Sequence, residues 1–223
     1  MNGNRRRQRQ PGTMLLTNDW YYFTGAIDAD TCQKLIDLGG DTFQDGRVDR
    51  QNEISKAERI TGKKGDPGLD VGSRSSDITW INEQWVYDLI FPYMETANEK
   101  AGWEFDIKSS ETPQLTRYEK GGFYYWHRDG YGDQLSIYKR PENKFLDGHV
   151  RKLSMTVLLN ENFEGGDLQF SGLSQKKVKV ETPALGGMGS IIVFPSFMEH
   201  RVAPITKGVR YSLVAWFLGP PFK

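Results

Sequence analysis

The sequence predicts a mainly β protein with supporting N-terminal helices, an α+β chain whose core is a two-sheet jelly roll. From about residue 105 to 219, short apolar runs alternate with turns marked by glycine pairs, which is typical of small antiparallel strands. Before residue 105, apolar residues recur at helical spacing instead. An aromatic content of 13% supplies enough large apolar surface for a packed core.

Local signals place the individual elements in chain order. The aromatic run 19–24 predicts a first strand, and Asp28 or Asp30 can cap a short helix that a glycine pair ends. A longer helix is predicted over about residues 82–100. The predicted strands of the core are 113–118, 123–129, 151–159, 167–170, 176–181, 189–194, 199–202 and 209–217.

The length of 223 residues suits a single domain, which we place at residues 13–223. Within it we expect helical support over about 26–104 and the jelly-roll core over about 105–219. Residues 1–12 are polar and basic, and they predict a flexible arm. Residues 41–76 are rich in glycine and charged residues and contain too few apolar residues for a core, so they predict a loop-rich excursion.

The composition argues against several classes of protein. Twenty-nine Lys and Arg balance twenty-nine Asp and Glu, and a neutral chain lacks the positive field that favours nucleic-acid binding. The single cysteine, Cys32, lies in an apolar helical pattern, which predicts a reduced core thiol and rules out an internal disulfide. No run approaches the ~20 apolar residues of a membrane span, and no secretory signal is visible, so we expect a cytoplasmic protein.

The candidate metal ligands are few, because the chain has only three histidines. His127 and Asp129 stand two residues apart in a predicted strand, where alternate residues share a face. His149 lies in a polar segment typical of a loop, whereas His200 follows an apolar strand and is the better third ligand. Two imidazoles and one carboxylate leave three adjacent coordination positions open, which suits non-haem iron(II). The alternative is a strand histidine satisfied by a neighbouring carboxylate.

Arg210 adds a second component to this candidate site. It stands ten residues after His200 in a mostly apolar strand, and a hairpin folded about residues 205–206 is predicted to bring Arg210 roughly opposite His200. Because a buried guanidinium is costly without an anion, a ligand should meet it. A dicarboxylate that chelates the metal at one end would offer its far carboxylate to Arg210. The alternative partner is an internal carboxylate such as Asp167 or Glu199.

Ordered motifs run through residues 73–219. They are Gln114 and Tyr118 before a glycine pair and His127-x-Asp129, then Leu158-Leu159-Asn160 with Glu164-Gly165-Gly166, then Phe194-Pro195-Ser196 with His200-Arg201-Val202 and Arg210. This series resembles the 2-oxoglutarate- and Fe(II)-dependent dioxygenases, in particular the prolyl 4-hydroxylase-like branch of bacterial and bacteriophage type. The resemblance implies a double-stranded β-helix, the cupin-like form of the jelly roll.

The resemblance also implies roles for particular residues. Iron(II) would be bound by three of them, His127, Asp129 and His200. Arg210 would pair with the distal carboxylate of 2-oxoglutarate and so complete the catalytic set. Tyr118 matches a tyrosine that borders the cosubstrate pocket, and Trp216 matches a tryptophan on the strand after the basic residue, although each is alternatively an ordinary buried aromatic. The implied cofactors are Fe(II), 2-oxoglutarate and O2, with ascorbate as an accessory reductant.

The implied activity is hydroxylation of a C–H bond, with succinate and CO2 as co-products. The expected substrate is a peptidyl proline, and a free amino acid or small metabolite is the alternative. A non-catalytic jelly-roll binding module is a further alternative, and a nucleic-acid demethylase is disfavoured despite basic patches at 5–9 and 176–179. We expect residues 130–152, with part of 41–76, to form a lid over the iron, the alternative being passive surface loops.

Overall fold

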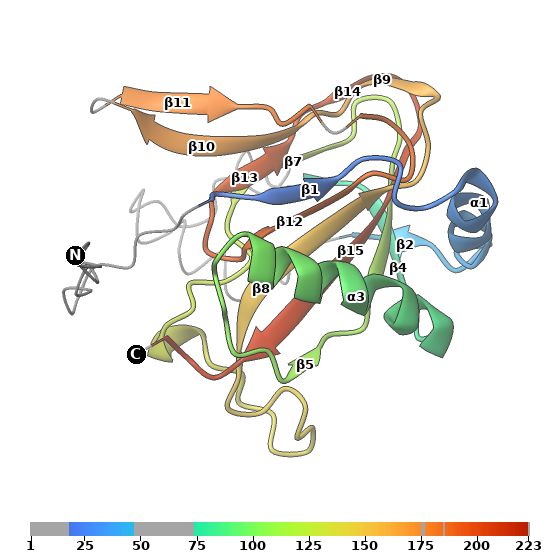
Figure 1. Cartoon of the computed structure of the whole chain (residues 1–223). Helices are drawn as coiled ribbons and strands as arrows, with labels where there is room; N and C mark the ends of the chain where they lie inside the picture. The colour runs from blue at the N-terminus through green and yellow to red at the C-terminus, as the bar shows by residue number, and fades with distance from the viewer. Residues whose placement is uncertain (1–17, 47–73, 175–176, 185, 223) are drawn as a thin grey trace, which may run out of the picture.

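The computed structural model of the chain describes residues 18–46, 74–174, 177–184 and 186–222 (Figure 1). The predicted arm at 1–12, the basic patch at 5–9 and residues 47–73 of the predicted excursion lie outside these residues. Within the described part of the chain, no helix is long and apolar enough to cross a membrane.

The described residues form two α-helices, a short 3-10 helix and a series of short strands. The helices are α1 (Ala29–Asp37), α3 (Gln84–Lys100) and η1 (Gln134–Ser136). The strands are β1 (Tyr21–Phe23), β2 (Gln44–Asp45), β3 (Arg74–Ser75), β4 (Asp77–Trp80), β5 (Ser109–Ser110), β6 (Gln114–Tyr118), β7 (Phe123–His127), β8 (Val150–Leu158), β9 (Phe163–Gly165), β10 (Leu168–Ser174), β11 (Lys177–Glu181), β12 (Ile191–Pro195), β13 (His200–Val202), β14 (Ile205–Gly208) and β15 (Arg210–Gly219).

The strands of the described residues assemble into a large sheet, a smaller one and an isolated pair. The major sheet has eight strands in the order β1-β12-β8-β15-β6-β4-β2, with β5 also paired to β15. The minor sheet has five strands in the order β11-β10-β13-β7-β3, and β9 pairs with β14. The predicted class, mainly β with supporting helices and a jelly-roll core, is therefore confirmed.

The major sheet separates two apolar clusters, because successive side chains of a strand point to opposite faces. On one face, Leu153, Met155 and Val157 of β8 pack in the larger cluster with residues of α1 and α3. Figure 1 shows α3 crossing this face over β8 and β15. On the other face, Ile192 and Phe194 of β12 pack in a smaller cluster with residues of the minor sheet. The space between the two sheets is where the polar candidate residues gather.

Helix α1 begins and packs as its sequence predicts, and α3 begins at Gln84, two residues after the predicted start at 82. Asp28 is the N-cap of α1, and its carboxylate accepts a hydrogen bond from the Thr31 backbone N–H over 2.8 Å. Cys32 of α1 is a fully buried free thiol in the larger cluster, as expected from its apolar neighbours. The helices thus cover the major sheet and leave its other face to the site.

The predicted hairpin about residues 205–206 is wrong. Residues Ile205–Gly208 form a separate strand, β14, which pairs with β9 and carries the chain from the minor sheet to the major sheet. His200 therefore pairs with His127 in the minor sheet, whereas Arg210 pairs with Tyr118 in the major sheet. The short sequence signal of β14 was masked by Pro204 and Gly208, which are typical of turns.

Candidate metal centre

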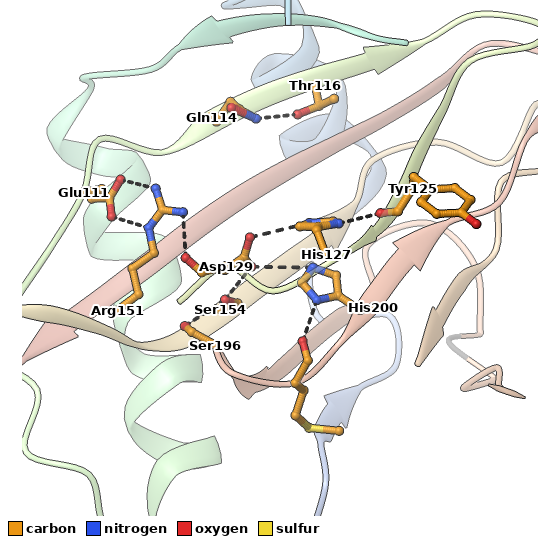
Figure 2. Close-up of polar contacts among 11 residues, drawn as sticks. Glu111, Gln114, Thr116, Tyr125, His127, Asp129, Arg151, Ser154, Ser196 and His200 are labelled. Carbon is orange, nitrogen blue, oxygen red and sulfur yellow. Dashed lines mark hydrogen bonds and ion pairs between the residues drawn. The ribbon is translucent and has the colours of Figure 1, made fainter. Parts of the chain in front are cut away.

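His127, Asp129 and His200 converge in the space between the two sheets (Figure 2). One ligand atom from each residue lies within 4.8 Å of the others. His127 Nε2 is 3.7 Å from Asp129 Oδ1, and His200 Nε2 is 3.6 Å from Asp129 Oδ2. Among the described residues, this is the group of His, Cys, Asp and Glu side chains that can hold a metal ion, and His149 is not part of it.

Backbone carbonyls orient both imidazoles toward the centre of this group. His127 Nδ1 lies 2.7 Å from the Tyr125 carbonyl oxygen, and His200 Nδ1 lies 2.9 Å from the Met198 carbonyl oxygen. A carbonyl can only accept, so each Nδ1 carries the proton when the ring is neutral. The Nε2 lone pair of each ring is then free to face a metal, as is usual for metal-binding histidines.

A β-bulge and a second aromatic ring help to place His127. Between β7 and β13 the register shifts, because His127 pairs with His200 while Tyr124 pairs with Val202. Three residue steps on β7 thus oppose two on β13, which turns Tyr124 and His127 to the same side. The two rings stack with their centroids 3.5 Å apart, and the Arg74 guanidinium lies 4.8 Å from the Tyr124 ring centroid.

Asp129 lies beyond the end of β7, so strand alternation does not aim its carboxylate. Its backbone carbonyl accepts a hydrogen bond from Arg151 Nη1 over 3.2 Å. Its Oδ2 accepts one from the Ser154 hydroxyl over 2.6 Å, and Ser154 in turn lies 2.9 Å from the Ser196 hydroxyl. The carboxylate is therefore held by strand β8 and not by its own strand.

The electrostatics of the group favour a neutral His127 imidazole beside an ionised Asp129 carboxylate. Burial, followed by the neighbouring His200, lowers the pKa of His127 to about 3. Burial alone would raise the pKa of Asp129, but His200, His127 and Arg151 outweigh it and lower the value to about 2. A neutral nitrogen lone pair and a charged carboxylate are the protonation states that metal binding requires.

Glu111 and Arg151 form a largely buried ion pair next to this group, and the sequence does not single this pair out. Arg151 Nε and Nη2 donate to the two oxygens of Glu111 over 2.5 and 2.6 Å, and the Tyr138 hydroxyl also donates to Glu111. The guanidinium stacks 4.0 Å from the Trp216 ring centroid. The available signal was a pair of charged residues, Arg151 and Lys152, at the start of the core strand β8, where a buried cation is expected to have a partner.

Arg210 is a buried cation at another point of the same interior. Its side chain is 2% exposed and its Nη1 donates to the Ser212 hydroxyl over 3.0 Å. Among the described residues no carboxylate forms an ion pair with it, although the charges of Tyr118 and Asp167 act on it. Burial lowers the pKa of the guanidinium below its usual value. Of the two alternative partners proposed from the sequence, Asp167 is close enough only for this longer-range effect.

The structure brings Tyr118 to Arg210 but places Trp216 elsewhere. Tyr118 is 3% exposed, and its ring centroid is 5.7 Å from the Arg210 guanidinium. Trp216 stands six residues further along β15, which corresponds to roughly 20 Å of strand. It pairs in register with Ser154 and lies under Arg151, so it borders the Asp129 side of the interior. A contact between Trp216 and the cosubstrate stays a prediction.

The donor set fits a bound iron, and a buried guanidinium without an ion-pair partner among the described residues lies in the same interior. Two imidazoles and a carboxylate form the mixed nitrogen and oxygen set that suits non-haem iron(II). Thr156 and Leu158 stay partly exposed in the centre of the major sheet, so the space between the sheets is open to solvent at that level. The guanidinium of Arg210, which forms no ion pair with a described carboxylate, would favour an anionic ligand.

A jelly roll with this triad and a buried arginine defines the class of Fe(II)- and 2-oxoglutarate-dependent oxygenases. The sequence profile of the 2OG-Fe(II) oxygenase superfamily matches residues 113–218. These residues contain the triad and Arg210, so the jelly-roll core of the chain is similar to that superfamily. The cofactors of the class, Fe(II) and 2-oxoglutarate, agree with those expected from the sequence.

Several named proteins are similar to this chain. PKHD-type hydroxylase IL0759 of Idiomarina loihiensis is 22% identical over 201 residues, covering 86% of this chain and 74% of its own. PKHD-type hydroxylase tll1907 of Thermosynechococcus vestitus is 39% identical over 109 residues, covering 46% of this chain and only 40% of its own. The viral collagen prolyl hydroxylase vCPH of Paramecium Bursaria Chlorella virus-1, in a 2OG complex, has the same fold, with a TM-score of 0.56 at 20% identity over 91% of this chain and 97% of its own.

Proposed function

We propose that this protein hydroxylates a peptidyl proline in a reaction that consumes 2-oxoglutarate and O2 and releases succinate and CO2. The observation that carries the proposal is Arg210, a cation that is 2% exposed, lacks an ion-pair partner among the described residues and faces the interior that holds the triad. The similar proteins named PKHD-type hydroxylases support a hydroxylation, and the one named a collagen prolyl hydroxylase supports a prolyl substrate.

In the proposed arrangement, His127, Asp129 and His200 hold the metal, and Arg210 holds the distal carboxylate of 2-oxoglutarate. Bound iron(II) would supply the activation of O2 and the oxidative decarboxylation of the cosubstrate. The protein's own part is to bind and orient. Ser212 fixes one N–H of Arg210, which leaves the remaining donors of the guanidinium for a carboxylate.

The groups that would bind the dicarboxylate and the metal face one another across the space between the two sheets. Arg210, Tyr118 and Ser212 lie on the major sheet, and the two histidines lie on the minor sheet. A dicarboxylate between them would neutralise the buried guanidinium at one end while its other end faces the triad. Desolvating both partners together strengthens their attraction and helps to exclude bulk water from the reacting atoms.

The proposal is tested by measuring succinate formation with Fe(II) and 2-oxoglutarate across a panel of proline-containing peptides, free amino acids and oligonucleotides. Selective stimulation by the proline peptides is expected. Asp129→Ala should abolish the iron-dependent succinate, and full turnover in this variant would refute the assignment. Stimulation by a free amino acid alone would instead select the small-molecule alternative.

A matched pair of arginine variants tests the cosubstrate site separately. Arg210→Met should raise the KM for 2-oxoglutarate at least about 30-fold, since removing one partner of a buried charge pair costs about 2 kcal/mol or more. Arg201→Met is the control, because Arg201 follows His200 on β13, points to the opposite face and bonds to Gln169 over 2.8 Å. Equal KM values in the two variants would argue against Arg210 as the anion site.

A further inference from the structure

A pair of buried serines stands behind the carboxylate of the candidate triad. Ser154 of β8 and Ser196, in the turn before β13, are both fully buried. The Ser154 hydroxyl donates to Asp129 Oδ2 over 2.6 Å, and the hydroxyls of Ser154 and Ser196 lie 2.9 Å apart. Figure 2 shows the three side chains in a row that ends at the two histidines.

The direction of these hydrogen bonds follows from counting protons. A serine hydroxyl has one proton to donate and can accept at its oxygen. The proton of Ser154 is used in the bond to Asp129, whose ionised carboxylate can only accept. The bond between the two serines must therefore run from Ser196 to Ser154. Chains of this polarity strengthen each member, because each donor is polarised by the bond it accepts.

Both serines are fixed by the backbone of the sheet. Ser154 lies in the middle of β8, paired with Phe194 on one side and Trp216 on the other. The Ser196 N–H donates to the Lys152 carbonyl, and its carbonyl accepts from the Gly130 N–H, each over 3.0 Å. The same turn thus binds the residue that follows Asp129. Ser196 and Ser154, here called the serine relay, thus connect a carboxylate that lies outside a strand to β8 of the major sheet.

We propose that Ser154 and Ser196 are positioning residues that hold the Asp129 carboxylate in its metal-binding orientation. The proposal rests on the assignment of Asp129 as a metal ligand under the proposed function. Among the described residues, Ser154 makes the one hydrogen bond to the Asp129 side chain, since Arg151 reaches only its backbone carbonyl. Without Ser154, rotation of the carboxylate away from the two Nε2 atoms meets no opposing bond.

The test is the affinity of the full-length protein for Mn(II), measured by titration calorimetry without 2-oxoglutarate. Ser154→Ala should weaken binding by about 10- to 100-fold, the usual effect of removing a group that orients a metal ligand. Ser196→Ala should weaken it less, because Ser154 keeps its bond to Asp129. Ser109→Ala is the matched control, since Ser109 is also buried but donates to the Phe145 carbonyl over 2.5 Å.

The possible outcomes separate this inference from the proposed function. Unchanged affinity in a folded Ser154→Ala protein, or an equal loss in Ser109→Ala, would overturn the relay while the metal site stands. If Ser154→Ala does not fold, Ser196→Ala decides, and wild-type affinity in that variant would overturn the relay. Failure of the wild-type protein to bind Mn(II) would overturn both proposals. Serine-dependent metal binding without 2-oxoglutarate turnover would leave the relay in place and refute the function.

Discussion

The two faces of the major sheet differ sharply, although the same strands build both. On the helix face of β8, Leu153, Met155 and Val157 are all fully buried in an apolar cluster. On the interior face of the same strand, Ser154 is buried in a polar relay and Thr156 is partly exposed. The helix face therefore supplies stability through close packing. The interior face is packed less closely at Thr156 and carries polar groups.

The largest expected effect is on the helix face. Phe217 of β15 is fully buried and packs edge-to-face on Phe91 of α3, with ring centroids 5.3 Å apart. Phe217→Ala should lower the free energy of unfolding by about 3–5 kcal/mol, measured by urea denaturation. That is a large part of the ~5–15 kcal/mol of a typical domain. A loss below about 1 kcal/mol would contradict the view that this face carries the stability.

Removing one partner of the interior ion pair should be the next largest effect. Glu111→Gln leaves Arg151 charged and nearly enclosed, and it should cost about 3 kcal/mol in the free energy of unfolding. We expect the low end of the usual range because the two side chains keep 12% and 20% exposure. Glu164→Gln is the control: its pair with Lys207 is 64% and 75% exposed, so a change below about 1 kcal/mol is expected. Equal losses in the free energy of unfolding for the two variants would show that the interior ion pair stabilises the fold no more than an exposed one.

These two faces also explain what the sequence could predict. Alternating apolar residues and glycine turns indicated the core strands correctly, because a strand with one packed face leaves a strong period of two. His127, Asp129 and His200 were singled out because their spacing and scarcity are visible without a structure. The apolar helix face and the candidate metal ligands could thus be predicted from the sequence.

The contacts that position the site residues could not be predicted from the sequence, because they depend on which strands pair. The bulge that stacks Tyr124 on His127 exists only in the pairing of β7 with β13. Strand β14 forms only because β9, some forty residues earlier, offers it a partner. Ser154 and Arg151 reach Asp129 across more than twenty residues of sequence. Such contacts are set by tertiary pairing and leave no local pattern.

Acid should destabilise the metal-free protein through its interior face. The pKa of His127 is lowered in the folded state to about 3 from 6.5, so stability is complete above pH 6.5 and is lost as the pH falls toward 3. Asp129 adds a loss between pH 3.8 and about 2, because its folded pKa is also lowered. We expect more than about 1.4 kcal/mol, the equivalent of one pKa unit, to be lost between pH 6.5 and 4. In urea titrations, His127→Gln should flatten this part of the profile, and an unchanged slope would count against it.

Most substitutions of buried residues lower the free energy of unfolding, whereas Arg210→Met should leave it unchanged or raise it. Because Arg210 is buried without an ion-pair partner among the described residues, replacing it with an apolar side chain of similar length should leave the ligand-free protein equally stable or more stable by about 1 kcal/mol. The same variant should lose the stabilisation that 2-oxoglutarate gives the wild-type protein in a thermal shift assay. A marked loss of stability without ligand would mean that Arg210 is a structural part of the core.

The smallest effect is expected at Thr156, between two of the most sensitive positions of β8. Its neighbours Met155 and Val157 are fully buried on the helix face, whereas Thr156 points to the interior and remains partly exposed. Thr156→Val keeps the shape of the side chain and exchanges a solvated hydroxyl for a methyl group, so the free energy of unfolding should change by about 0.5 kcal/mol or less. Met155→Ala, one residue away, should cost about 2–5 kcal/mol in the same urea experiment. Similar losses in both variants would mean that the interior is as tightly packed as the helix face, and a dicarboxylate would then have no room between the sheets.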